Sequence, residues 1–135
     1  MNILTRRSVV IAGTIGLLSG ALLTSALAEV RDYEFQLVKS EVKKSSAAIV
    51  AVRLVDKRSG KAVPDAVISA KRIDMAPDGM AGMAAPIEQM PSTEPGVYRF
   101  KTALSAEGRW QLSLAAKVQG ETGTLESKLV LTVVP

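Results

Sequence analysis

A period of two runs through residues 96–118 and constrains the fold more than any other feature of the sequence. Alternate positions along both halves of this stretch are apolar, and most of the positions between them are polar or charged. The inward set is Tyr98, Phe100, Leu104, Trp110, Leu112, Leu114, Ala116 and Val118. A short polar loop at 105–108 ends in a glycine, so the pattern predicts a β-hairpin with one buried face. Three of the chain's five aromatic side chains lie in this stretch, and we expect the core to be built on it.

Shorter alternating stretches on both sides predict further strands. They lie at 30–40, 47–56, 67–73 and 124–134, and residues 86–90 are a candidate for a short seventh strand. Polar turns are expected at 41–46, 56–61 and 119–123. In the 67–73 strand we expect Ala66, Ile68 and Ala70 to face inward. Six or seven strands without an amphipathic helix predict an all-β fold, an immunoglobulin-like antiparallel β-sandwich.

Composition excludes several classes of site. The chain has no cysteine and no histidine, which rules out disulfides, thiolate or imidazole metal sites, cysteine nucleophiles and serine–histidine triads. The acidic residues sit in turns and form no recognisable catalytic motif, so we expect no catalytic residues and no enzymatic activity. The first 28 residues hold two arginines and no acid, which leaves 15 basic against 13 acidic residues in the remainder. No basic stripe is present there, so no nucleic-acid binding is expected.

Residues 1–28 have the layout of an export signal. Arg6 and Arg7 form a basic start, residues 9–23 are mostly apolar, and Ala26-Leu27-Ala28 is a small-x-small cleavage site. Cleavage after Ala28 would leave residues 29–135 as one domain in the periplasm, with no membrane contact. The paired arginines suit either the general export route or the twin-arginine route. An uncleaved N-terminal anchor is the alternative, although 15 residues are short for a spanning helix.

Residues 74–95 are unusual because they contain four of the chain's five methionines. Four prolines and two glycines in the same segment predict a long loop. The thioether is a soft, uncharged ligand that selects Cu(I) or Ag(I) over harder cations. Met75, Met80 and Met83 fall within nine residues of one another and are the candidate metal ligands.

In the metal interpretation, Asp74 and Asp78 could offset the charge of a bound cation. Two other interpretations of the methionines stay open. In the second interpretation the methionines fill gaps at the edge of the core, and this is the role expected of Met90. In the third, they give an adaptable apolar surface to a protein partner.

Two pieces of sequence resemble the YtkA-like/FixH-like family of small exported or membrane-tethered β-sandwich domains. They are VRLVDKRSGKAVPDAVISA at 52–70 and PGVYRFKTALSAEGRWQLSLAAKV at 95–118, with a methionine-bearing segment between them. The most specific positions are Gly60, Pro64, Asp65, Ala66, Gly96, Tyr98, Gly108 and Trp110. Within that family the chain is most similar to short periplasmic proteins associated with heavy-metal, chiefly copper, efflux systems of the resistance-nodulation-division type.

This resemblance implies a β-sandwich over residues 31–134 and a role as a periplasmic accessory module in copper or silver efflux or homeostasis. An efflux adaptor or another periplasmic protein is the implied partner. The chain departs from the FixH proteins proper, which keep a membrane helix and serve oxidase assembly, and it lacks the histidine–methionine motif of periplasmic copper chaperones. A structural or protein-interaction domain without metal, or a FixH-like assembly factor, are the alternatives.

Overall fold

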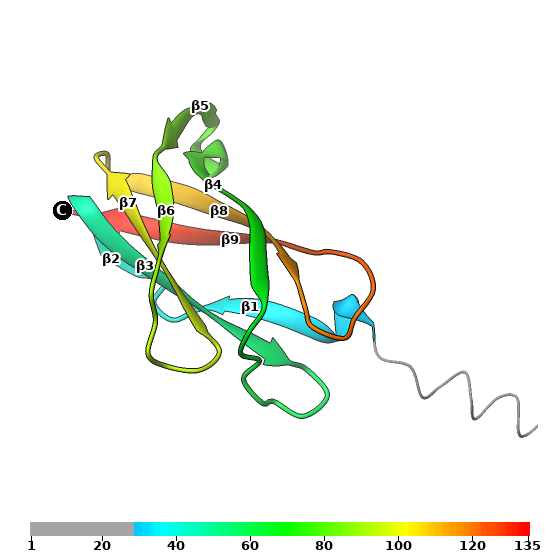
Figure 1. The fold of residues 1–135 in the computed structure, drawn as a ribbon. Helices are drawn as coiled ribbons and strands as arrows, with labels where there is room; N and C mark the ends of the chain where they lie inside the picture. Colours follow the sequence, from blue (N-terminus) through cyan, green and yellow to red (C-terminus); the bar gives the residue numbers. More distant parts are fainter. Residues whose placement is uncertain (1–28) are drawn as a thin grey trace, which may run out of the picture.

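The computed structural model describes residues 29–135 of the chain, so the export signal predicted at 1–28 lies outside the described residues. Nine strands and two short 3-10 turns are present in the described part (Figure 1). In chain order they are η2 (Val30–Asp32), β1 (Tyr33–Leu37), β2 (Glu41–Lys43), β3 (Ser45–Asp56), β4 (Val67–Met75), η3 (Ala76–Asp78), β5 (Met80–Ala85), β6 (Ile87–Met90), β7 (Val97–Leu104), β8 (Gly108–Lys117) and β9 (Leu125–Val134). No helix within residues 29–135 is long and apolar enough to cross a membrane.

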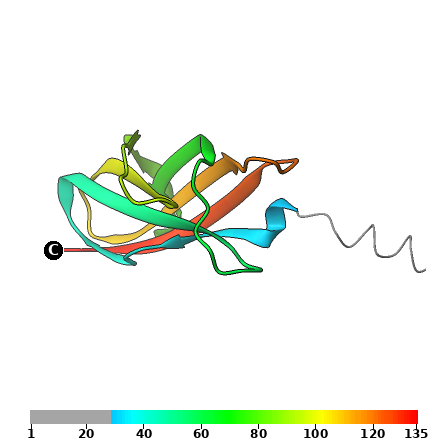
Figure 2. The same cartoon turned by 60° about the horizontal axis from the view of Figure 1, so that its bottom comes forward.

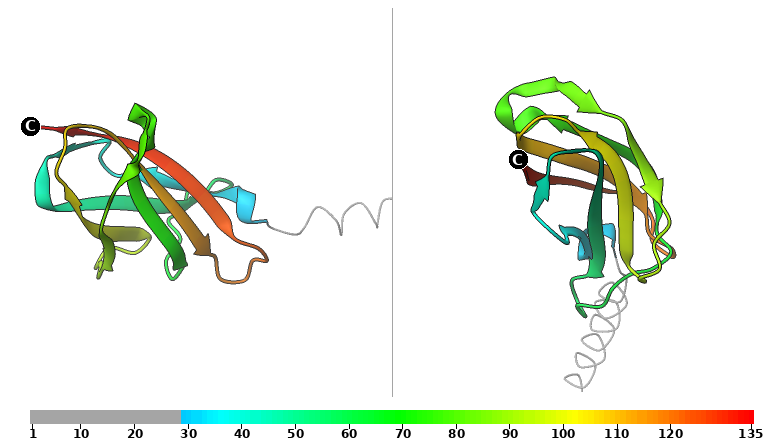
Figure 3. Two further views of the ribbon diagram at one scale, coloured as in Figure 1. Left: turned by 90° about the horizontal axis from the view of Figure 1, so that it is seen from above. Right: turned by 90° about the vertical axis from the view of Figure 1, so that its left-hand side faces the viewer.

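The strands form two sheets that face each other (Figures 2 and 3). One sheet has the order β1-β3-β7-β6 and the other β2-β9-β8-β4-β5. All pairs are antiparallel except β2 with β9, which is parallel. The same strand order characterises immunoglobulin-like sandwiches, so the predicted fold class is confirmed. The strand number is higher than the six or seven expected.

The chain crosses repeatedly from one sheet to the other. Among the eight connections between the described strands, five join strands of different sheets: those after β1, β2, β3, β5 and β7. At the crossing after β3, the Tyr98 hydroxyl donates to the carbonyl of Val63 at 2.7 Å and accepts from the N–H of Ala66 at 3.0 Å. The hydroxyl of a core tyrosine therefore fixes the path of the linker between the two layers.

The core lies between the sheets and uses the alternation seen in the sequence. Val50, Val52 and Leu54 of β3 are buried as predicted, and Phe35 of β1 packs edge-on against Tyr98 with ring centroids 6.1 Å apart. The inward residues of β7, β8 and β9 complete the same cluster. Since burial of apolar area is the main stabilising term, these faces determine how the sheets stack.

The hairpin predicted at 96–118 is wrong in its pairing, although both strands are where the alternation placed them. β7 pairs with β3 and β6, whereas β8 pairs with β4 and β9. The loop at 105–107 therefore joins the two sheets instead of two neighbours in one sheet. Alternation shows which face of a strand is buried, but it does not show the partner. Two strands that lie in opposite sheets, with the core between them, bury their apolar faces as well as two paired strands do.

The inward set predicted for the 67–73 strand is only partly correct. Ala66 is buried and Ile68 half-buried, but Ala70 is exposed. The pairing of β4 with β8 shifts between Ile68 and Ala70, which marks a β-bulge. The bulge moves the alternation by one residue, so the inward positions of the second half are Ile73 and Met75.

Two segments expected to be irregular contain strands. Residues 41–43 of the predicted polar turn form β2 at the edge of the larger sheet. The 74–95 segment is not one long loop, because it holds η3 and β5, while β6 confirms the short strand that was a candidate at 86–90. Both β5 and β6 are edge strands, and Pro86 lies between them where the chain changes sheets. Proline is tolerated at such positions because no ladder hydrogen bond is lost.

We expect the Trp110→Ala substitution to lower the free energy of unfolding by about 3–5 kcal/mol. The Trp110 side chain is 2% exposed, and its indole N–H donates to the carbonyl of Ala106 at 3.0 Å. Urea unfolding followed by circular dichroism measures the loss. Val130→Ala is the control, because Val130 is exposed on β9 and should change stability by less than about 0.5 kcal/mol. A cost below about 1 kcal/mol for Trp110→Ala would contradict the central role of this residue in the core.

Candidate binding site on the β4–β5 hairpin

The methionines of interest lie on a hairpin at one end of the sandwich (Figure 1). β4 ends at Met75, η3 and Gly79 make the turn, and β5 begins at Met80 directly opposite Met75. Gly79 has φ of 77°, a left-handed conformation that suits glycine. β5 is the last strand of its sheet. The hairpin therefore presents one strand at a free edge of the described sandwich.

The structure separates the three candidate metal ligands. The Met75 side chain is 2% exposed and belongs to the core, whereas Met80 and Met83 are each 43% exposed. A soluble ion can approach the thioethers of Met80 and Met83, but Met75 is shielded by the sandwich. Metal binding by Met80 and Met83 stays a prediction.

Met90 was expected to fill the edge of the core, but the structure does not place it there. It is half-buried on β6 and pairs with Arg99, an exposed residue of β7. Directly paired residues share a face of the sheet, so this register points Met90 outward. It is absent from the core cluster and from the partly buried residues that pack against it.

Arg72 and Asp74 brace the hairpin from β4. The buried Asp74 carboxylate accepts a hydrogen bond from Nε of Arg72 at 2.8 Å and from the N–H of Ala76 at 2.9 Å. Arg72 also donates from its guanidinium to the carbonyl of Ala81 in β5 at 2.9 Å. Burial by itself raises the pKa of Asp74, but these hydrogen bonds and the positive charges of Arg72 and Lys128 outweigh it, so the pKa is lowered.

Asp78 and Arg109 brace the hairpin from β8. The Asp78 carboxylate accepts from the backbone N–H of Arg109 at 2.8 Å and from its Nε at 2.9 Å. The same guanidinium donates to the carbonyl of Pro77 at 2.8 Å. The hydrogen bonds from the Arg109 backbone and side chain lower the pKa of Asp78.

Gly108 allows this second brace to form. A Cβ at position 108 would lie 2.6 Å from Oδ2 of Asp78 and 2.8 Å from Cε of Met75, and the glycine has φ of 133°. A side chain there would push η3 away from β8. From its place in the sequence Gly108 was expected to end a turn, whereas in the structure it also lets η3 and β8 approach each other closely.

The two aspartates are therefore occupied by arginines and hold the hairpin in place. Offsetting the charge of a cation would require Asp74 or Asp78 to release its partner. No role was assigned to Arg72 from the sequence, although its spacing from Asp74 was a usable signal, because residues two apart on a strand share a face.

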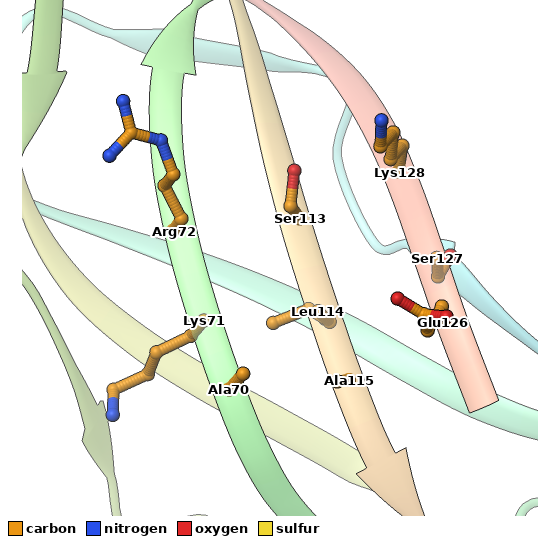
Figure 4. A pocket seen from close by; sticks show the side chains of 9 residues that line it. All are labelled: Ala70, Lys71, Arg72, Ser113, Leu114, Ala115, Glu126, Ser127 and Lys128. Atoms are coloured by element: carbon orange, nitrogen blue, oxygen red, sulfur yellow. The ribbon is translucent and has the colours of Figure 1, made fainter. Parts of the chain in front are cut away.

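Residues 29–135 contain no cluster of three or more acidic side chains that could hold a metal ion. The outer face of the larger sheet is shallowly hollowed over β4, β8 and β9, as Figure 4 shows. Arg72, Ser113 and Lys128 form one row across it. The hollow forms because the short side chains of Ser113 and Ala115 lie between longer ones on β4 and β9. It is an open surface of the sheet that carries both positive and negative side chains. The exposed thioethers are therefore the candidate ligands that the hairpin offers to a soft cation.

Comparisons with known proteins give one family match. The model of a family described as YtkA-like matches residues 27–115. No curated protein matches the sequence. Two solved structures are similar in shape. The Lin-41 filamin domain has 17% identity and a TM-score of 0.46, covering 80% of this chain and 95% of that chain. The ZirS C-terminal domain has 14% identity and a TM-score of 0.42, covering 83% and 74%.

Acid should weaken the braces of the hairpin. Because the folded pKa of Asp74 and Asp78 lies below the ordinary 3.8, their contribution is complete above that pH and is lost as the pH falls through the lowered values. We expect the urea midpoint of the Asp74→Asn variant to fall less than that of the wild type between pH 5 and pH 2. Glu126→Gln, at an exposed position of β9, should follow the wild-type curve. Parallel curves for the wild type and Asp74→Asn would contradict the role of the Asp74 charge.

Proposed function

Because this chain belongs to the YtkA-like family, we propose that it is an exported binding domain of a copper or silver efflux or homeostasis system in the periplasm. In this proposal the β4–β5 hairpin meets the ligand and the domain catalyses no reaction. The observation that carries the proposal is the pair of half-exposed thioethers of Met80 and Met83 on a braced strand edge.

The chemistry of the thioether supports a monovalent coinage metal. A neutral sulfur ligand favours Cu(I) or Ag(I) over zinc, magnesium or calcium. Cysteine thiolates oxidise readily to disulfides, whereas a thioether remains a ligand in an oxidising compartment. Two thioethers without histidine or cysteine make a weak and exchangeable site. Such a site suits the transfer of an ion to a protein partner, either an efflux adaptor or another periplasmic protein.

The geometry of the hairpin supports a contact role as well. The Asp78–Arg109 pair connects the turn of the hairpin to β8. Arg72, paired with Asp74 within β4, donates to the Ala81 carbonyl of β5, so the exposed thioethers lie on a fixed surface. A preorganised surface loses less conformational entropy when it binds. The hairpin therefore holds the side chains of Met80 and Met83 in a fixed place where a partner can contact them.

A second candidate function is protein contact without metal. The burial of Met75 favours it, because only two of the three expected sulfur ligands face solvent. In this version Met80 and Met83 give an adaptable apolar edge to a partner, as flexible methionine side chains do at other binding surfaces.

Metal titration separates the two candidates. We expect the protein to compete with a chromogenic Cu(I) chelator and the double variant Met80→Leu/Met83→Leu to lose this competition, because leucine keeps the apolar volume and removes the sulfur. The matched controls are Met90→Leu and Met75→Leu, which should bind as the wild type does. Competition no stronger than the chelator background, or binding unchanged in the double variant, would contradict the metal function and leave the contact function.

The double variant should retain its stability, which shows that any lost binding is not a folding defect. Both side chains are 43% exposed, so the free energy of unfolding should change by less than about 1 kcal/mol. Urea unfolding measures it. A loss above roughly 2 kcal/mol would mean that these methionines pack in the core.

Export should leave Glu29 at the N-terminus. Mass spectrometry of the protein from the periplasmic fraction should show a chain lacking residues 1–28, because Ala26-Leu27-Ala28 has the pattern of a cleavage site. Ala28→Lys should block processing, whereas Ala28→Ser should not. A full-length chain in the membrane fraction would instead favour the uncleaved anchor.

A further inference from the structure

A groove of about 500 Å³ opens where the chain changes sheets after β1. It lies between residues 38–43 and the first half of β3. Val38 and Ile49 border it, and their side chains are 52% and 39% exposed. Its size falls in the range of ligand-binding clefts, roughly 300–1,000 Å³. β2 and β5 lie at opposite edges of the larger sheet, so this groove is separate from the methionine hairpin.

The β3 strand leaves backbone groups unpaired along the groove. The carbonyl of Ala51 accepts a hydrogen bond from the N–H of Val38 at 3.0 Å. Pairing groups alternate along a strand, so the next residue of β3 that faces this edge is Ile49. A continued β1 would place residue 40 opposite Ile49, but the carbonyl of Ser40 accepts from the N–H of Thr132 in the larger sheet at 2.8 Å. The N–H and C=O of Ile49 therefore face the groove without a backbone partner within residues 29–135.

Only a short piece of this edge is regular. The pairing of β3 with β7 shifts between Ser45 and Ala48, and the N–H of Ala47 donates to the hydroxyl of Ser45 at 3.1 Å. From Ala48 to Arg53 the register is continuous. The edge therefore offers a partner one residue, Ile49, in the geometry of a sheet, and contacts between side chains must supply the rest of the affinity.

Basic side chains surround the groove. Lys39 and Lys43 line it. Two exposed basic residues of β7 pair with β3 beside the groove and share the outer face of the sheet with Ile49: Lys101 and Arg99. None of these four forms an ion pair within residues 29–135. The lining and its paired neighbours hold two acidic residues, Glu41 and Glu88, so the surroundings keep a positive charge.

We propose that this groove, lined by Val38, Val42 and Ile49, binds an extended acidic segment of a partner protein. An apolar residue of the segment packs between Val38 and Ile49, and its backbone forms the two hydrogen bonds that Ile49 leaves open. Acidic residues on both sides of the apolar one meet Lys39 and Lys43. A second copy of this chain fits less well, because it would bring the same basic residues against each other. The segment binds whether or not the methionine hairpin holds a metal ion.

A nuclear magnetic resonance titration of the isotope-labelled protein tests the site. The probe is the blocked pentapeptide Glu-Thr-Ile-Thr-Glu, which has an apolar centre, acidic ends and a preference for extended structure. We expect the backbone amide signal of Ile49 and the methyl signals of Val38 and Ile49 to shift most. The same peptide methylated at the backbone nitrogen of its isoleucine cannot donate to the Ile49 carbonyl and should bind roughly tenfold more weakly.

A reversal of charge separates the groove from unspecific attraction. The double variant Lys39→Glu/Lys43→Glu should lose the acidic peptide and bind Lys-Thr-Ile-Thr-Lys instead, because the interaction between the charges changes sign. The matched control is Lys57→Glu/Lys61→Glu, which makes the same change of net charge in the loop between β3 and β4. All four positions are exposed, so both variants should fold normally. The control should keep the preference of the wild type.

Each other outcome would overturn the proposal. An Ile49 amide signal that stays unchanged in a large excess of the acidic peptide would exclude the site. Equal binding of the acidic and the basic peptide by the wild type would exclude the acidic partner. Ile49 signals that shift with protein concentration alone would assign the groove to a second copy, and shifts with decanoate but not with peptide would assign it to a small apolar molecule.

This titration and the Cu(I) competition fail independently. No metal ion is present in the peptide experiment, so a negative result there leaves the metal function standing. Loss of Cu(I) binding in the methionine variants, or its absence in the wild type, leaves the groove and its basic surroundings unchanged.

Discussion

Burial of two facing apolar layers is the interaction on which the rest of the structure depends. Trp110 of one sheet and Phe100 of the other are almost completely shielded from water. The candidate site rests on the same layers, because Met75 at the base of the β4–β5 hairpin is part of the core and lies against Gly108. The hairpin is thus attached through packing as well as through its ion pairs.

The sequence predicts which face of a strand is buried, but it does not predict which strands are neighbours. The alternations of β1, β3, β7, β8 and β9 were visible because most inward positions hold an apolar side chain, although Thr102 of β7 is a buried polar exception. Pairing depends on backbone hydrogen bonds, which every residue except proline can make. The stretch at 96–118 was consequently assigned to one hairpin, while its two strands belong to different sheets.

The bulge in β4 shows a second limit. Between Ile68 and Ala70 the strand gains a residue relative to β8, and the alternation then changes phase. No glycine or proline stands at this position to mark it. Only the later inward pair, Ile73 and Met75, records the change. Met75 itself was assigned to the loop predicted at 74–95, because the prolines and glycines of that segment concealed the end of β4.

The sequence predicted which methionines to consider for the candidate site, but not the strands that carry them or how they are arranged. A thioether is equally suited to a core and to a surface, so the sequence could not separate Met75 from Met80 and Met83. The Arg72–Asp74 pair could have been found from its spacing along one strand. Asp78 and Arg109 are 31 residues apart, and only the fold brings them together.

The repeated crossing of the chain between the two sheets has a consequence for how this domain unfolds. Neither layer is a continuous piece of sequence, because five of the eight connections between described strands pass from one layer to the other. If the strands of one sheet unfold, the strands of the other sheet lose the segments that connect them in sequence. Such an interleaved chain should lose its structure in a single all-or-none transition, and it should refold slowly because distant segments must meet before either sheet is complete.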